Sequence, residues 1–144
     1  MPLLTTTTSN LRTSGPIIEV LISPSQALRR ILEEKQQLVP QPLQKIMLID
    51  TGASAYAIKT GIAKELNLRP HGTITISTAS HKSVICLTYD VDITFKIQKV
   101  AVLNVRVFES NFEGQPIDGL IGRDILSQGL LIYNGYDNAF TIGF

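Results

Sequence analysis

Residues 46–58 read IMLIDTGASAYAI, and this stretch decides the fold. An apolar strand runs straight into Asp50, Thr51 and Gly52, after which apolar residues resume. Charge at the end of a strand usually marks a turn, and Gly52 would give a plain turn its backbone freedom. The other interpretation is that Asp50 is a catalytic carboxylate held at the end of a buried strand. The apolar flanks favour the second interpretation, because a solvated turn does not need them.

The composition fits one globular domain. Of the 144 residues, 44% are hydrophobic and 17% are charged, which supplies a core and excludes disorder. A net charge of +1 without a run of Lys or Arg argues against nucleic-acid and anionic-membrane partners, and no apolar run is long enough to span a bilayer. Cys86 is the only cysteine, and the first residues lack the build of a signal peptide, so we expect a cytoplasmic protein.

The order of periodic segments predicts a mostly β protein. Residues 1–14 are rich in Thr and Ser and are expected to form a flexible arm before a domain at 15–144. A helical insertion is expected at about 24–42, with Ser23 as its cap. Many strands and few short helices favour a closed β structure. The predicted strands are 15–23, 45–50, 72–78, 85–95, 100–108, 130–134 and 139–144, and the predicted helices are 24–38, 59–68 and 123–128.

Residues 85–95 alternate strictly between apolar and polar side chains, which is typical of a long strand. With residues 72–78 this strand makes a hairpin whose tip is ASHKS, residues 79–83. Its length predicts that the hairpin projects beyond a compact body and acts as a flap.

Two motifs and the hairpin resemble the retropepsin-like aspartic proteases, and more narrowly their single-domain bacterial-type members. The motifs are LIDTGAS at residues 48–54 and GLIGRDIL at residues 119–126. The resemblance implies a retropepsin-like closed β-barrel with one lobe per chain. It also implies an aspartic endopeptidase without a cofactor, in which Asp50 from each chain of a homodimer activates water to hydrolyse an extended polypeptide.

The same resemblance assigns roles to the neighbouring residues. Thr51 would hydrogen-bond across the two-fold axis, and Gly52 would let the backbone approach the carboxylates. The expected substrate-binding residues are Ala53, Thr78, Ala79, Ser80 and Leu120, and those of the supporting second motif are Ile121, Gly122, Arg123 and Asp124.

The sequence departs from viral relatives at two places. They commonly carry an aspartate where this chain has Ser54, paired with the arginine that matches Arg123. Arg123 therefore needs another partner, and both Asp124 and a carboxylate of the other subunit stay open. The glycines of viral flap tips are replaced by Ala79, Ser80 and His81.

Other polar residues receive plain interpretations. His71 and His81 are expected in exposed loops and outside any metal-ligand spacing, so no metal site is predicted. Asp90 and Asp92 are expected to be solvated. Asp118 either contacts substrate or is a loop carboxylate, with the second preferred.

Two rival functions use the same fold. A peptide-binding module would hold an extended segment by strand pairing without cutting it. A regulatory subunit would dimerise with a different chain that carries its own aspartate. The intact DTG motif argues against the binding module, because a pure binder does not need that carboxylate, and the regulatory subunit is the weaker of the two rivals.

Overall fold

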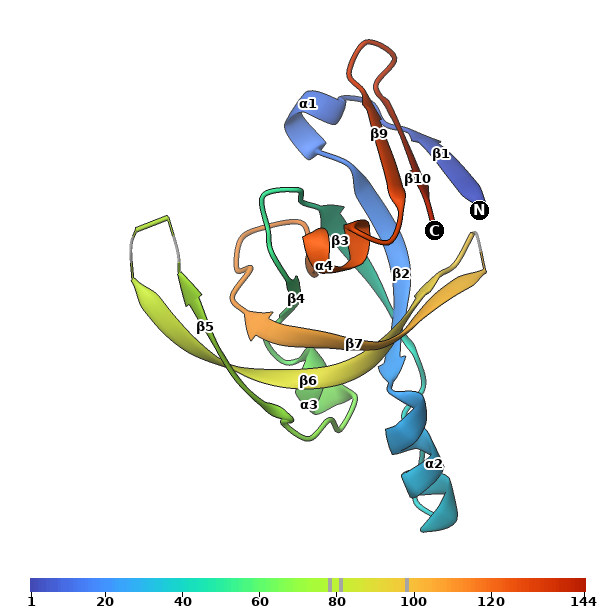
Figure 1. Cartoon of the computed structure of the whole chain (residues 1–144), viewed down its shortest axis with the longest axis vertical. Coiled ribbons are helices and arrows are strands. Elements are labelled where there is room, and N and C mark those ends of the chain that lie inside the picture. Colours follow the sequence, from blue (N-terminus) through green and yellow to red (C-terminus); the bar gives the residue numbers. More distant parts are fainter. Residues whose placement is uncertain (78, 81, 98) are drawn as a thin grey trace.

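The computed structural model describes residues 1–77, 79–80, 82–97 and 99–144. Figure 1 shows a barrel in the middle of the molecule, a small sheet that contains both termini, and a helix that projects from the opposite end. The strands are β1 (Leu3–Thr7), β2 (Ile17–Pro24), β3 (Leu43–Ile49), β4 (Tyr56–Lys59), β5 (Gly72–Ser77), β6 (Ser83–Phe95), β7 (Val100–Ser110), β8 (Gly119–Ile121), β9 (Leu130–Asn134) and β10 (Ala139–Gly143). The helices are α1 (Leu11–Ser14), α2 (Gln26–Glu34), α3 (Ile62–Glu65) and α4 (Arg123–Leu126).

Six strands close into a barrel in the order β2-β3-β8-β4-β7-β6, because β6 also pairs with β2. The predicted closed β-barrel is therefore confirmed. β8 lies parallel to β3 and antiparallel to β4, so the two motifs of the sequence are neighbours in one sheet. That arrangement brings residues 119–123 directly behind the loop that begins at Asp50.

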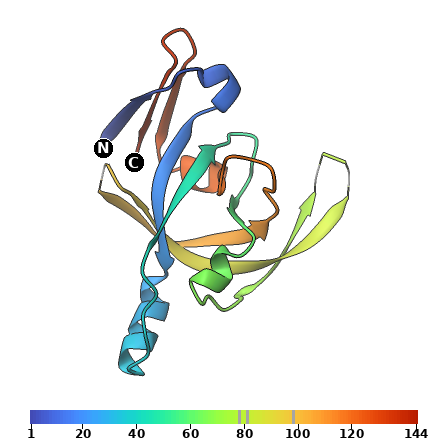
Figure 2. The ribbon, with the colours of Figure 1, turned by 180° about the vertical axis from the view of Figure 1, so that it is seen from behind.

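The long alternating strand is confirmed as β6, and its apolar face has two environments. Val91, Ile93 and Phe95 are at most 1% exposed, because they face the barrel core. Ile85 and Leu87 are 73% and 49% exposed, since this part of β6 pairs with β5 beyond the barrel. Both views show the β5–β6 hairpin extending away from the barrel body (Figures 1 and 2).

The N-terminal residues differ from the expected flexible arm. β1 pairs with β10 over five residues, and β10 also pairs with β9, which makes a three-stranded sheet. Leu11 is fully buried, and its N–H donates to the Asn138 side chain at 2.9 Å. The Thr-rich stretch is ordered by this tertiary pairing, which its own composition does not reveal.

The helical insertion is present as α2, but its start differs from the prediction. Ser25 is the N-cap, with its hydroxyl accepting the Leu28 N–H at 3.3 Å, whereas Ser23 and Pro24 belong to β2. Pro24 stays in the strand because it pairs with Val91 of β6.

Asp92 is not solvated, which corrects the sequence interpretation. Its side chain is 3% exposed and pairs with Arg29 of α2 at 2.9 Å. The second carboxylate oxygen accepts the Asn104 N–H at 2.8 Å, and Arg29 also donates to the Ser23 hydroxyl at 2.8 Å. A buried carboxylate needs such partners, so this ion pair fastens α2 to the barrel.

Asp90 is also paired rather than simply solvated. Its carboxylate lies 2.7 Å from His71 Nδ1 and 3.1 Å from Arg106 Nε, and its side chain is 19% exposed. His71 itself is exposed, as predicted. His81 falls outside the described residues.

None of the helices in the described part of the chain combines the length and the apolar character that crossing a bilayer requires.

Candidate active site

Asp50 follows the last residue of β3 and begins a tight loop that ends at β4. Its N–H donates to the Ile121 carbonyl at 3.0 Å, and its carbonyl accepts the Ala53 N–H at 3.2 Å. The carboxylate Oδ1 accepts the Gly52 N–H at 2.8 Å. Asp50 is half-buried while Thr51 and Gly52 are exposed, so the carboxylate is held by backbone at the surface of one chain.

Glycine is required at two positions that support this loop. A Cβ on Gly119 would lie 2.1 Å from the Ala57 carbonyl oxygen, and a Cβ on Gly122 would lie 2.6 Å from the Ala55 carbonyl oxygen. Backbone atoms cannot yield to such a contact as a flexible side chain can. The backbone of the second motif therefore packs directly on the backbone of the Asp50 loop and on the start of β4.

Within one chain, Arg123 does not pair with Asp124, the first of the two partners that the sequence left open. Its Nη1 donates to the Thr51 carbonyl at 2.7 Å, and its backbone N–H donates to the Ala53 carbonyl at 2.9 Å. Among the described residues, no carboxylate forms an ion pair with Arg123. Within one chain, the guanidinium thus donates to the Thr51 carbonyl rather than to a carboxylate.

Asp124 serves the other end of the loop. Its Oδ2 accepts the Tyr56 N–H at 2.9 Å, and its Oδ1 accepts the Ile125 N–H at 2.9 Å. The Tyr56 side chain is fully buried, and its hydroxyl has no hydrogen-bond partner among the described residues. Burial, and to a smaller extent the charge of Asp124, raises the pKa of the Tyr56 phenol far above its ordinary value. This phenol therefore stays protonated and is no candidate for acid–base work.

A cavity of about 250 Å³ opens beside the Asp50 loop. Its walls carry no charged side chain, and the polar groups in them are serines. Part of it belongs to a small apolar cluster, separate from the main core, around Ala57, Phe112 and Ile117. The lining residues are Gly52, Ala53, Ser54, Ala55, Ala57, Ile76, Ser77, Phe108, Ser110, Phe112 and Leu120.

The cavity brings together some of the predicted substrate-binding residues and omits others. Of these residues, Ala53 and Leu120 line it. Ala79 and Ser80 are exposed at the tip of the β5–β6 hairpin and are not part of the lining. Thr78 lies outside the described residues.

Sequence reasoning missed the wall opposite the catalytic loop. Phe108 and Ser110 end β7, and Phe112 follows two residues later. A signal was present, because these side chains continue the period-two alternation of the strand beyond the predicted end at residue 108. From the hairpin, Ile76 and Ser77 complete the lining.

Asp118 contacts backbone rather than this cavity. Its Oδ2 accepts the Ile46 N–H at 2.8 Å, and its carbonyl accepts the Lys59 N–H at 2.7 Å. It is absent from the cavity lining, so the loop-carboxylate interpretation fits the structure.

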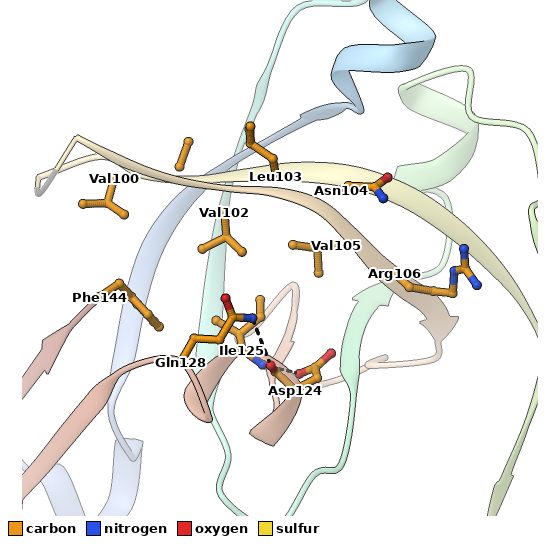
Figure 3. A pocket seen from close by; sticks show the side chains of 11 residues that line it. Val100, Val102, Leu103, Asn104, Val105, Arg106, Asp124, Ile125, Gln128 and Phe144 are labelled. Atoms are coloured by element: carbon orange, nitrogen blue, oxygen red, sulfur yellow. Dashed lines mark hydrogen bonds between the residues drawn. The ribbon is translucent and has the colours of Figure 1, made fainter.

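A larger cavity, of about 510 Å³, lies elsewhere (Figure 3). Val100, Val102 and Val105 of β7 point into it, facing Ile125 of α4 and Phe144. It includes neither Asp50 nor its loop. The smaller cavity is therefore the candidate site despite its lower volume, because residues 52–55 of the Asp50 loop line it.

No group of three or more His, Cys, Asp or Glu side chains in the described part of the chain is arranged to hold a metal ion.

The comparisons place these features in a family. A family model described as "Aspartyl protease" matches residues 42–125, which is more than half of the chain and contains the first motif and all but the last residue of the second. The chain belongs to the aspartyl protease family. Comparison with curated protein sequences gave no match.

Two solved structures are similar to this chain. A retropepsin-like aspartic protease from Rickettsia conorii has a TM-score of 0.53 and 12% sequence identity, with 97% of this chain and 90% of that chain covered. The retroviral protease-like domain of Ddi1 from Leishmania major has a TM-score of 0.44 and 12% identity, with 88% and 87% covered. The first likeness shows that the fold is retropepsin-like.

Proposed function

We propose that this chain is an aspartic endopeptidase that works as a homodimer, with Asp50 of each chain in one shared site. The observation that carries the proposal is the Asp50 carboxylate, fixed by the Gly52 N–H at 2.8 Å beside an uncharged cavity. Membership of the aspartyl protease family supports it.

The chemistry requires a second carboxylate. One group has to take a proton from water while another donates a proton to the carbonyl oxygen of the peptide bond. Two carboxylates held close together cannot both ionise, so one keeps a proton and the pair supplies both functions. The rate then falls at acid pH, where both are protonated, and at higher pH, where the shared proton leaves, and these limits belong to the pair.

A second copy of the chain is the proposed source of that carboxylate. The sequence contains one DTG word, and Thr51 and Gly52 are exposed at the outer side of the loop. A two-fold axis passing beside Asp50 would set two such loops face to face, with Thr51 bonding across the axis.

The proposed substrate is an extended polypeptide with an apolar side chain in the cavity. Phe108, Phe112 and Leu120 supply apolar surface there, and the walls carry no charge that would pair with a charged substrate side chain. The β5–β6 hairpin would cover the bound segment as a flap, since Ile76 and Ser77 already reach the cavity.

A peptide library read by mass spectrometry tests the proposal. Purified wild-type protein is incubated with the mixture, and the Asp50→Asn variant, which keeps the shape of the loop, is the control. We expect internal cuts with wild type, beside large apolar residues, and none with Asp50→Asn. Equal cutting by a folded, uncontaminated Asp50→Asn protein would sink the proposal. Peptides that bind without being cut would favour the binding-module alternative.

A further inference from the structure

The peptide group between Thr51 and Gly52 takes part in two hydrogen bonds at once. Its carbonyl oxygen accepts from Arg123 Nη1 at 2.7 Å, and its N–H donates to Asp50 Oδ1 at 2.8 Å. A peptide group is planar, so its C=O and N–H move as one rigid unit. A side chain that holds the oxygen therefore also aims the N–H.

We propose that Arg123 is a positioning residue for catalysis, acting on the Asp50 carboxylate through the Thr51–Gly52 peptide group. The guanidinium is permanently charged and donates to the carbonyl, which polarises the amide and makes its N–H a stronger donor. That N–H is aimed at one of the two carboxylate oxygens. Arg123 thereby fixes the direction of this donor to Asp50 and distinguishes Oδ1 from Oδ2.

Two further contacts hold the guanidinium's starting point in place. The Arg123 backbone N–H donates to the Ala53 carbonyl at 2.9 Å, and the Gly122 backbone packs directly on that of Ala55. The Arg123 backbone, and with it the base of the side chain, is therefore fixed relative to the loop. The neighbouring Asp124 directs its oxygens to the Tyr56 and Ile125 N–H groups, and among the described residues it forms no ion pair with Arg123.

This inference rests on the proposed function for its kinetic consequence. Arg123 and the loop are exposed in one chain, and a second subunit facing the loop would remove water from them and strengthen the relay. The hydrogen bonds themselves are present in one chain, so part of the inference is testable without any catalysis.

The kinetic test uses Arg123→Gln and Arg123→Lys, with Arg30→Gln as the matched control. Arg30 is an exposed arginine on α2, remote from the catalytic loop in sequence and outside the lining of its cavity. For Arg123→Gln we expect kcat to fall about ten-fold with KM changed less, as for loss of a charge-assisted hydrogen bond. The pH–rate profile should also differ from that of wild type, because the donor to one carboxylate oxygen is no longer held in place. Arg123→Lys should recover part of the rate.

A merely structural role makes a different prediction. Activity would then fall in proportion to the folded fraction measured by circular dichroism, and the pH profile would stay in place. That result would overturn the inference. If Arg123→Gln folds poorly, adding methylguanidinium to Arg123→Ala should restore the rate with the wild-type pH profile, whereas a rise in folded fraction without that profile would contradict the relay.

The second test observes the relay directly by NMR and needs no substrate. In wild type the Gly52 amide proton resonance reports the hydrogen bond to Asp50, and in Arg123→Gln that resonance should move upfield because the donor is less polarised. Identical Gly52 amide proton resonances in Arg123→Gln and Arg30→Gln would overturn the inference. Because this readout does not depend on peptide cleavage, an inactive wild type would refute the proposed function while leaving the relay separately decidable.

Discussion

The loop of residues 50–55 and the β5–β6 hairpin face the same cavity, but they are held by different means. Hydrogen bonds from Asp50, Arg123 and Tyr56 fix the loop to the segment around β8, and the backbone contact at Gly122 leaves it no slack. Among the described strands, β5 pairs only with β6, and Ile85 remains 73% exposed. The loop that holds the carboxylate is therefore fixed by several independent contacts, while the hairpin that would cover a substrate is attached to the barrel through one strand pairing.

Gly122→Ala, which disturbs the tightly held loop, should have the largest effect. Its Cβ would press on the Ala55 backbone at 2.6 Å, so we expect unfolding free energy to fall by about 2 kcal/mol or more and activity to be largely lost. Gly72→Ala, in the hairpin, is the matched control, because its Cβ would meet only Thr88 Oγ1 at 3.7 Å. Urea unfolding of both variants measures the difference. Equal stability losses would show that the loop is no tighter than the hairpin.

Ile76→Ala, in the hairpin, should affect substrate binding more than stability. The half-buried Ile76 lines the cavity, so KM for an apolar substrate should rise about ten-fold while unfolding free energy falls by no more than about 1 kcal/mol. Thr75→Ala, at the adjacent exposed position, should change neither. Steady-state kinetics beside thermal melts separates the two effects. A large stability loss with unchanged KM would make the hairpin part of the barrel body.

Mixing subunits tests whether the tightly held loop is complete in one chain. When wild-type and Asp50→Asn chains are mixed equally and exchange at random, about a quarter of the dimers carry two wild-type chains, so activity per wild-type chain should drop to roughly half. Exchange is verified by native mass spectrometry with one isotopically labelled chain. Unchanged activity after demonstrated exchange would mean that each chain has its own full site.

Tyr56→Phe should have the smallest effect and reports on the far end of the loop. Since the phenol's pKa is raised on folding, the unfolded chain loses this proton first as pH rises above about 10, and stability falls there. The phenylalanine variant should fall less steeply over the same range, with near-equal stability at neutral pH. Denaturant midpoints at several alkaline pH values measure both slopes. Parallel slopes would contradict the burial of this hydroxyl.

The sequence was sufficient for the closed β structure, which its many strands and few short helices indicated. The Asp50 loop and the second motif were identified by their resemblance to retropepsin-like proteases, because both are short continuous motifs. The partner of Arg123 was not predictable in that way, because every residue carries a carbonyl and none of them is marked in the sequence.

Burial of polar residues was the second failure, and it has the same origin. Asp92 lies on the polar face of its strand by alternation, yet its partner Arg29 is 63 residues away in sequence. The Thr-rich β1 likewise acquires its order from β10, at the other end of the chain. Pairings of this kind depend on topology, which local periodicity does not contain.

The Arg29–Asp92 pair has a consequence for anyone who wishes to engineer a minimal version of this barrel. Figure 2 shows α2 extending from the barrel on its own, which makes residues 24–42 look removable. Deleting them would remove Arg29, the cation that pairs with the Asp92 carboxylate, which is 3% exposed while α2 is in place. A shortened domain should therefore replace Asp92 with an apolar residue in the same step, and Asn104, whose N–H also depends on that carboxylate, is the next position to redesign.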